Sequence, residues 1–182
     1  MQRFTRSIRA AINHRCWYVA LSSALTLPDV CGRLMEPAEK SSEKRYANWF
    51  REWMQPLYTS VVPGEGERIF LSGSDCYALR CSYLHEGGGD ITNQRARKAL
   101  EKFHFISPAP PPLDWKLHRN LLGGTVLQLQ VDLFCLEMAD AVERWSQSVI
   151  GDAVIQERMQ SLLVIYSHAP GLPELDWGEY DF

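Results

Sequence analysis

Residues 72–89 are the stretch on which the interpretation of this chain depends, and they read Ser-Gly-Ser-Asp-Cys-Tyr-Ala-Leu-Arg-Cys-Ser-Tyr-Leu-His-Glu-Gly-Gly-Gly. Ser72 followed three residues later by Asp75 is typical of a helix N-terminus, because the hydroxyl accepts a backbone N–H and the acid suits the positive end of the helix dipole. The three glycines predict the end of the helix, with one of them in a left-handed conformation. Between these signals lie Arg80, a cation suited to phosphate, and His85, which exchanges protons near neutral pH.

The segments on both sides of this helix favour helices as well. Apolar residues recur at spacings of three and four, which predicts helices at about 5–25, 41–56, 131–149 and 152–165. A short helix is expected at about 28–34 with Pro28 in its first turn, and a short basic helix at 93–102. Ser41 is expected to cap the helix that Pro56 ends, and residues 61–68 are expected to form a loop.

The segment 103–130 has a different character from the helices around it. Residues 103–106 are strand-like, four of the five residues 108–112 are proline, and 115–119 and 125–130 alternate as strands do and are expected to pair as a hairpin. Residues 170–182 form an acidic C-terminal tail. We therefore predict one mainly helical domain spanning 1–182, with a small β-hairpin within about 103–130.

Composition places this chain among ordinary globular proteins. Of its 182 residues 46% are apolar and 23% charged, and the net charge of -3 gives no general attraction to nucleic acid. The five cysteines contain no Cys-x-x-Cys, so neither a zinc site nor a disulfide framework is indicated, and we expect no metal and no cofactor. The arginine-interrupted N-terminus does not resemble a signal peptide, and no stretch is apolar enough to span a membrane, which predicts a cytoplasmic location.

The spacing of Arg80 and His85 does not identify a site without its surroundings. Arg9 and His14 show the same offset of five residues. On a regular helix, residues five positions apart point about 140° away from each other and lie about 7.5 Å apart along the axis. A phosphate can therefore meet both side chains only if the helix unwinds near His85 or if two chains contribute one residue each.

The run from Leu79 to Gly87 resembles the Arg-x4-6-His motif of the HEPN superfamily, small helical domains found in prokaryotic toxins, abortive-infection proteins and RNA-processing enzymes. The resemblance implies a helical bundle in which the segment at about 103–130 is a small β-hairpin insertion. It also implies a homodimer that gathers two motifs into a metal-independent endoribonuclease site. Arg80 then corresponds to the phosphate-binding arginine and His85 to the catalytic histidine. Cys81 stands where the family usually has Asn, Asp or His, and Glu86 is a candidate for orienting the histidine.

The resemblance also implies partners and a biological setting. RNA is the expected substrate, and an antitoxin or regulatory protein is an expected partner in a toxin or phage-defence role. Two basic clusters could together follow an RNA backbone, although each cluster taken alone is more typical of a solvated charged face. Their members are Arg3, Arg6 and Arg9, and Arg95, Arg97 and Lys98. The alternative function is a non-catalytic HEPN-like scaffold that binds a nucleotide or a protein partner.

Overall fold

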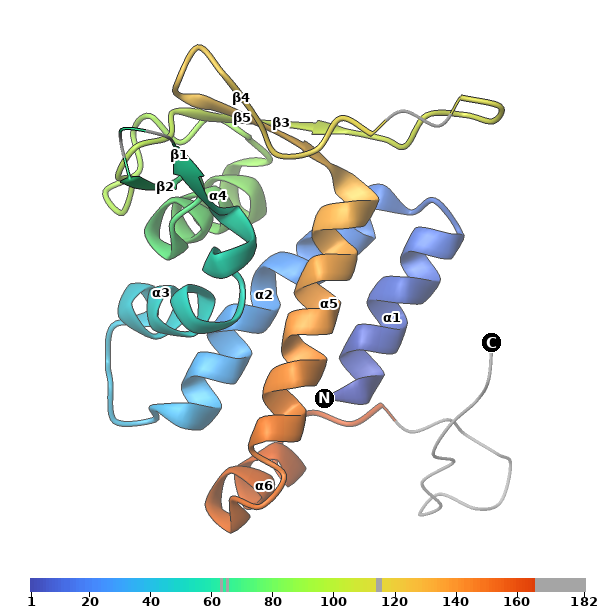
Figure 1. Cartoon of the computed structure of the whole chain (residues 1–182). Coiled ribbons are helices and arrows are strands. Elements are labelled where there is room, and N and C mark those ends of the chain that lie inside the picture. The colour runs from blue at the N-terminus through green and yellow to red at the C-terminus, as the bar shows by residue number, and fades with distance from the viewer. Residues whose placement is uncertain (63, 65, 114–115, 166–182) are drawn as a thin grey trace.

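The computed structural model describes residues 1–62, 64, 66–113 and 116–165, and Figure 1 shows how its elements are arranged. The α-helices of the described part are α1 (Gln2–Asn13), α2 (Trp17–Met35), α3 (Ser42–Trp53), α4 (Gly73–Glu86), α5 (Val131–Ser148) and α6 (Ala153–Gln160). The strands are β1 (Thr59–Val62), β2 (Gly66–Ile69), β3 (Lys102–Ile106), β4 (Asn120–Leu122) and β5 (Val126–Gln130), and a 3-10 turn, η1 (Gln55–Tyr58), precedes β1.

Helix α2 lies at the centre of the helical bundle and contacts α1, α3, α4 and α5. Its buried face is apolar over most of its length, which explains why so many neighbours pack on it. Large aromatic side chains fill the space between the helices, and Trp49, Phe50, Phe134 and Trp145 are completely or almost completely buried. The chain is therefore mainly helical around one core, as the hydrophobic periodicity predicted.

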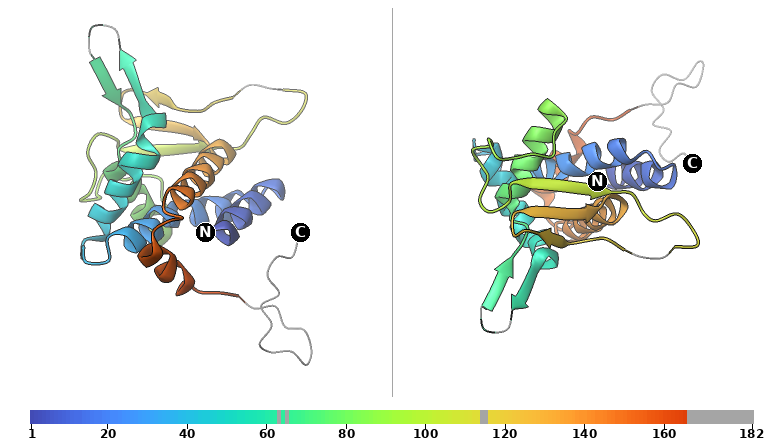
Figure 2. Two further views of the ribbon diagram at one scale, coloured as in Figure 1. Left: turned by 60° about the horizontal axis from the view of Figure 1, so that its bottom comes forward. Right: turned by 90° about the horizontal axis from the view of Figure 1, so that it is seen from above.

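Two small sheets lie near the N-terminal end of α5 (Figures 1 and 2). Strands β1 and β2 form an antiparallel hairpin that projects from the helices. The other sheet has the order β3-β5-β4, with β3 parallel to β5 and β4 antiparallel to it. Strand β5 continues directly into α5, so the sheet is fixed to the bundle by the chain itself.

The N-terminal helices differ from the prediction in where they begin and end. The expected helix at 5–25 is two helices, because Arg15 adopts a left-handed conformation (φ +56°) and the chain turns before α2 starts. The turn lets α1 pack back on α2 and α5, and this burial outweighs the local preference for one long helix. The separate helix at 28–34 is wrong as well, because Pro28 lies inside α2.

Two further local predictions are wrong and two are confirmed. Residues 59–69 form a hairpin rather than a loop, with Gly64 and Gly66 both at positive φ. No helix forms at 93–102, because the buried Asp75 carboxylate accepts hydrogen bonds from the backbone N–H groups of Lys98 (2.7 Å) and Ala99 (3.2 Å). Ser41 caps α3 as expected, and α3 ends before Pro56.

The second half of the chain follows the prediction more closely. Helix α5 matches the expected 131–149, and β3 matches the expected strand at 103–106. The predicted hairpin is present as β4 and β5, although its first strand is 120–122 instead of 115–119. Helix α6 ends at Gln160 rather than near 165, and the acidic tail at 170–182 lies outside the described residues.

Candidate active site

Helix α4 forms where its local signals predicted. The Ser72 side chain accepts from the Asp75 backbone N–H at 3.1 Å and donates to the Asp75 carboxylate at 2.7 Å, which reproduces the expected capping interaction. Gly87 ends the helix in a left-handed conformation (φ +71°). The helix is continuous through Glu86, so it does not unwind near His85, and the two candidate side chains point about 140° apart within one chain.

Arg80 is held in a partly buried position between α4 and α2. Its Nη2 lies 3.8 Å from the Asp29 carboxylate, and its guanidinium lies 5.9 Å from the centre of the Tyr77 ring. Its Nε is buried and has no hydrogen-bond partner among the described residues. Arg80 is therefore positioned by Asp29 and Tyr77, and these contacts do not use all of its N–H donors.

His85 has the opposite environment. Its side chain is exposed in the last turn of α4 and has no hydrogen-bond or ion-pair partner within the described part of the chain. The Glu86 carboxylate accepts from Gln94 Nε2 at 3.3 Å, and no hydrogen bond joins it to His85 within the described residues. Cys81 is half-buried, with its sulfur 4.0 Å from Arg80 Nη1, so it contacts the arginine and not the histidine.

The first basic cluster lies on α1, which packs on α2 and α5. Arg9 is bound to two carboxylates of α5, Asp140 at 2.6 Å and Glu143 at 3.0 Å, so its charge is compensated. Arg3 donates to the Leu162 carbonyl at 3.1 Å, and Arg6 is exposed. This cluster therefore contributes to packing between the ends of the described chain.

The second basic cluster lies in the loop that Asp75 fixes to α4. Arg95 and Lys98 are exposed, whereas Arg97 forms an ion pair with Glu101 at 3.6 Å. This loop follows the glycines that end α4. Its exposed cations therefore lie shortly after His85 in the sequence. The two predicted basic clusters thus lie on different elements, the first on α1 and the second in the loop after α4.

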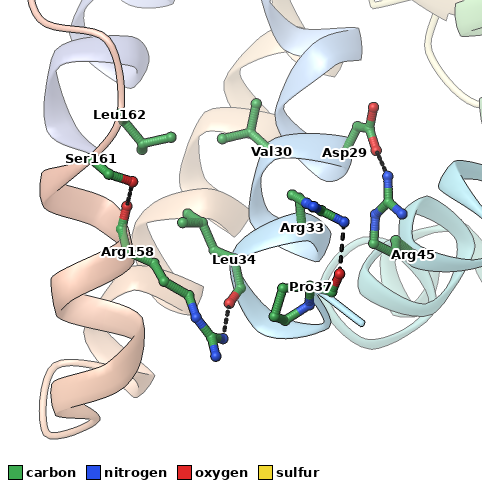
Figure 3. A pocket seen from close by; sticks show the side chains of 9 residues that line it. All are labelled: Asp29, Val30, Arg33, Leu34, Pro37, Arg45, Arg158, Ser161 and Leu162. Atoms are coloured by element: carbon green, nitrogen blue, oxygen red, sulfur yellow. Dashed lines mark hydrogen bonds and ion pairs between the residues drawn. The ribbon is translucent and has the colours of Figure 1, made fainter. Parts of the chain in front are cut away.

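A cluster that sequence inspection missed lies on the other side of Asp29. The Asp29 carboxylate also faces Arg45 Nη2 at 3.5 Å, and both residues line a pocket of about 510 Å³ together with Arg33 and Arg158 (Figure 3). The four residues come from α2, α3 and α6. Sequence offered no signal for this group, because arginines on three separate amphipathic helices look like ordinary surface charges.

A second missed cluster surrounds Glu137 of α5. Its carboxylate accepts from the Tyr58 hydroxyl at 2.5 Å, from His118 Nε2 at 3.1 Å, and from Arg119. Burial opposes ionisation of Glu137, but the hydrogen bonds from His118 and Tyr58 and the charge of Arg119 outweigh it and lower its pKa. The Gln130 backbone N–H donates to His118 Nδ1 at 3.2 Å, so Nε2 is the ring nitrogen that is left to donate to Glu137.

Nothing else in the described residues assigns a function to the chain. Among the described residues, no group of three or more His, Cys, Asp or Glu side chains is arranged to hold a metal ion. None of the helices in the described ranges combines the length and apolar character that crossing a bilayer requires. No protein-family model matches the chain, and neither a curated protein nor a solved structure matches it.

Proposed function

We propose that this chain is a metal-independent endoribonuclease of the HEPN type, with a site composed of Arg80 and His85 from two copies of the chain. The observation that supports it best is the continuity of α4 through Glu86. A continuous helix holds the two side chains on different faces, so a phosphate that contacts both needs a second chain. His85 is exposed and unpartnered within the described residues, as a group that meets another chain or a substrate must be.

The surface beside the C-terminal half of α4 suits a second copy. Tyr18 and Val19, at the start of α2, are 79% and 60% exposed although both are large apolar side chains. The Tyr83 hydroxyl donates to the Tyr18 carbonyl at 3.2 Å, which fixes this patch next to the turn of α4 that carries His85. Exposed apolar side chains gathered at one place favour association, and two-fold symmetry would bring two His85 residues together.

The chemistry needs no metal ion. One imidazole accepts the proton of a ribose 2′-hydroxyl, the oxygen attacks the adjacent phosphorus, and a second, protonated imidazole donates to the departing 5′-oxygen. The bond from phosphorus to the 5′-oxygen breaks as the new one forms, which leaves a 2′,3′-cyclic phosphate and a 5′-hydroxyl. Arg80 stabilises the charge that builds on the phosphate oxygens, for which the long contact to Asp29 leaves donors available.

The biological setting is proposed on the resemblance in the α4 motif. A dimeric ribonuclease of this kind would act on RNA in the cytoplasm as a toxin or in phage defence, restrained by an antitoxin or regulatory protein. The exposed Arg95 and Lys98 beside the end of α4 are available to contact the RNA backbone.

The proposal is tested by incubating purified protein with RNA in EDTA and comparing wild type with His85→Ala and Arg80→Ala. We expect wild type to cleave and each variant to lose activity by roughly a hundredfold or more. The matched control is His14→Ala, because His14 is also exposed, also lies at the C-terminal end of a helix, and also lies five residues after an arginine. Equal cleavage by wild type and His85→Ala would contradict the proposal, as would a monomeric active enzyme in analytical ultracentrifugation.

The alternative function is a non-catalytic scaffold that binds a nucleotide or a protein partner. The contact of Arg80 with Asp29 and the presence of Cys81 after the arginine favour it. A wild-type protein that is folded and dimeric but leaves RNA intact in EDTA would support this alternative.

A further inference from the structure

The pocket beside Asp29 is enclosed by three helices. Figure 3 shows Arg33 and Leu34 from α2, Arg45 from α3 and Arg158 from α6, with Leu162 beyond the end of α6. Its volume of about 510 Å³ is in the range of small-molecule sites. The close approach of α2 and α3 depends on Gly32, because a Cβ there would lie 2.7 Å from the Arg45 carbonyl oxygen.

The charge of the pocket lining is strongly positive. Three arginines line the pocket, and Asp29 is the carboxylate among its lining residues. Asp29 is shared, because its second oxygen lies 3.8 Å from Arg80. The lining therefore carries at least two positive charges in excess, which matches the charge of a phosphate monoester at neutral pH.

The burial of the Arg45 charge is not fully explained by its partners within the protein. The residue is 9% exposed, its contact to Asp29 is long at 3.5 Å, and its Nε is buried without a partner among the described residues. Its remaining contact is a hydrogen bond to the Glu39 carbonyl. Burying a charge is costly unless it is well paired and hydrogen-bonded, so an anion in the pocket would strengthen the pairing that the long contact to Asp29 provides.

Arg33 and Arg158 have a structural role that leaves most of their guanidinium N–H donors available. Arg33 donates to the Pro37 carbonyl and Arg158 to the Leu34 carbonyl, both at 2.7 Å, so each satisfies a carbonyl at or beyond the C-terminal end of α2. A guanidinium has five N–H donors in a planar fork, and each of these arginines uses one nitrogen in this way. Capping α2 accounts for two of the arginines and leaves the burial of Arg45 unexplained.

We propose that this pocket binds a small organic phosphate, with the phosphate held by Arg45, Arg33 and Arg158. Arginine forks suit phosphate oxygens, which accept paired hydrogen bonds from a planar guanidinium. Val30, Leu34 and Leu162 supply an apolar wall for the organic part of the ligand. The inference goes beyond the proposed ribonuclease function and does not depend on it.

The test is isothermal titration calorimetry with AMP and glucose 6-phosphate as probes and adenosine as the uncharged control. We expect both phosphates to bind at one site per chain, adenosine not to bind, and binding to weaken as KCl is raised. Arg33→Ala and Arg158→Ala should each weaken binding about tenfold or more, because each removes charge-assisted hydrogen bonds. Arg51→Ala is the matched control, because Arg51 is an exposed arginine of α3 that does not line the pocket.

The possible outcomes separate this inference from the ribonuclease proposal. Phosphate binding by wild type that is weaker in Arg33→Ala and Arg158→Ala supports the site, whether or not RNA is cleaved. No heat from either phosphate, equal binding of adenosine, or equal affinity in Arg33→Ala, Arg158→Ala and wild type would each overturn it. The variants must show the wild-type circular dichroism spectrum, and a rise in wild-type Tm with added AMP is a second readout that a structural role does not predict.

Discussion

The clusters around Glu137 and Asp29 contain similar groups and treat them differently. Glu137 accepts hydrogen bonds from Tyr58, His118 and Arg119, and those to Tyr58 and His118 measure 2.5 Å and 3.1 Å. Asp29 faces two arginines at 3.5 Å and 3.8 Å, and both arginines retain a buried nitrogen without a partner in the described part of the chain. Arg119 of the first cluster also keeps a buried Nε without a partner in the described residues. The clusters therefore differ in their carboxylates: Glu137 is held closely by Tyr58 and His118, whereas Asp29 meets its two arginines only at long range.

This difference explains why the two clusters have different roles. The Glu137 cluster joins α5 to the segment before β4, and it keeps Arg119 in a left-handed conformation (φ +61°) that a non-glycine residue rarely adopts. Such strain persists where surrounding contacts enforce it. The Asp29 cluster instead borders a pocket on one side and Arg80 of α4 on the other, so it links the two candidate sites.

The largest expected effect on stability comes from breaking the cluster around Glu137. Glu137→Gln should lower the free energy of unfolding by about 3 kcal/mol, because it removes the charge that Arg119 and the Tyr58 hydroxyl are arranged around. Urea denaturation followed by circular dichroism measures this loss. A loss below about 0.5 kcal/mol, typical of surface substitutions, would show that the cluster is not structural.

Acid should remove part of the same stabilisation. The pKa of Glu137 is lowered in the folded state, so its contribution is present above the ordinary glutamate pKa and is lost as pH falls through the lowered value. As the pH falls from about 5 to below the lowered pKa of Glu137, wild type should therefore lose more unfolding free energy than Glu137→Gln. Parallel curves of unfolding free energy against pH for the two proteins would contradict the assignment.

The smallest effect on stability is expected at the cluster around Asp29. Asp29→Asn should cost about 1–2 kcal/mol, less than Glu137→Gln, because its ion pairs are long although Arg45 is buried. The same change removes the negative charge from the pocket lining, so AMP should bind several-fold more tightly to Asp29→Asn than to wild type. Denaturation and calorimetry on the same preparation test both parts, and weaker AMP binding would contradict the proposed charge balance.

Elements with strong local signals were predicted well. Ser72, Asp75 and Gly87 gave the bounds of α4, and Ser41 gave the start of α3, because capping depends on atoms within one turn of the chain. The long apolar stripe of α5 was equally informative. Predictions failed where distant contacts outweighed local preference, as at Arg15, at Pro28 and in the loop that Asp75 holds.

The candidate site was only partly accessible from sequence. The positions of Arg80 and His85 on α4 followed from the helix signals, and the continuous helix then excluded unwinding as a way to bring them together. Glu86 was considered as an orienting group for His85, but its contact with Gln94 could not be anticipated, because the path of residues 87–94 after the glycines has no periodic signal.

The sequence by itself determined that this chain folds as a mainly helical domain and that α4 ends just after His85, because both depend on periodicity and capping within a few residues. Only the tertiary structure placed Asp29 between Arg45 and Arg80 and brought Arg158 to the pocket beside Arg33. These groups lie far apart in the chain, and the packing of α2, α3, α4 and α6 decides which charges meet and which nitrogens stay unpaired.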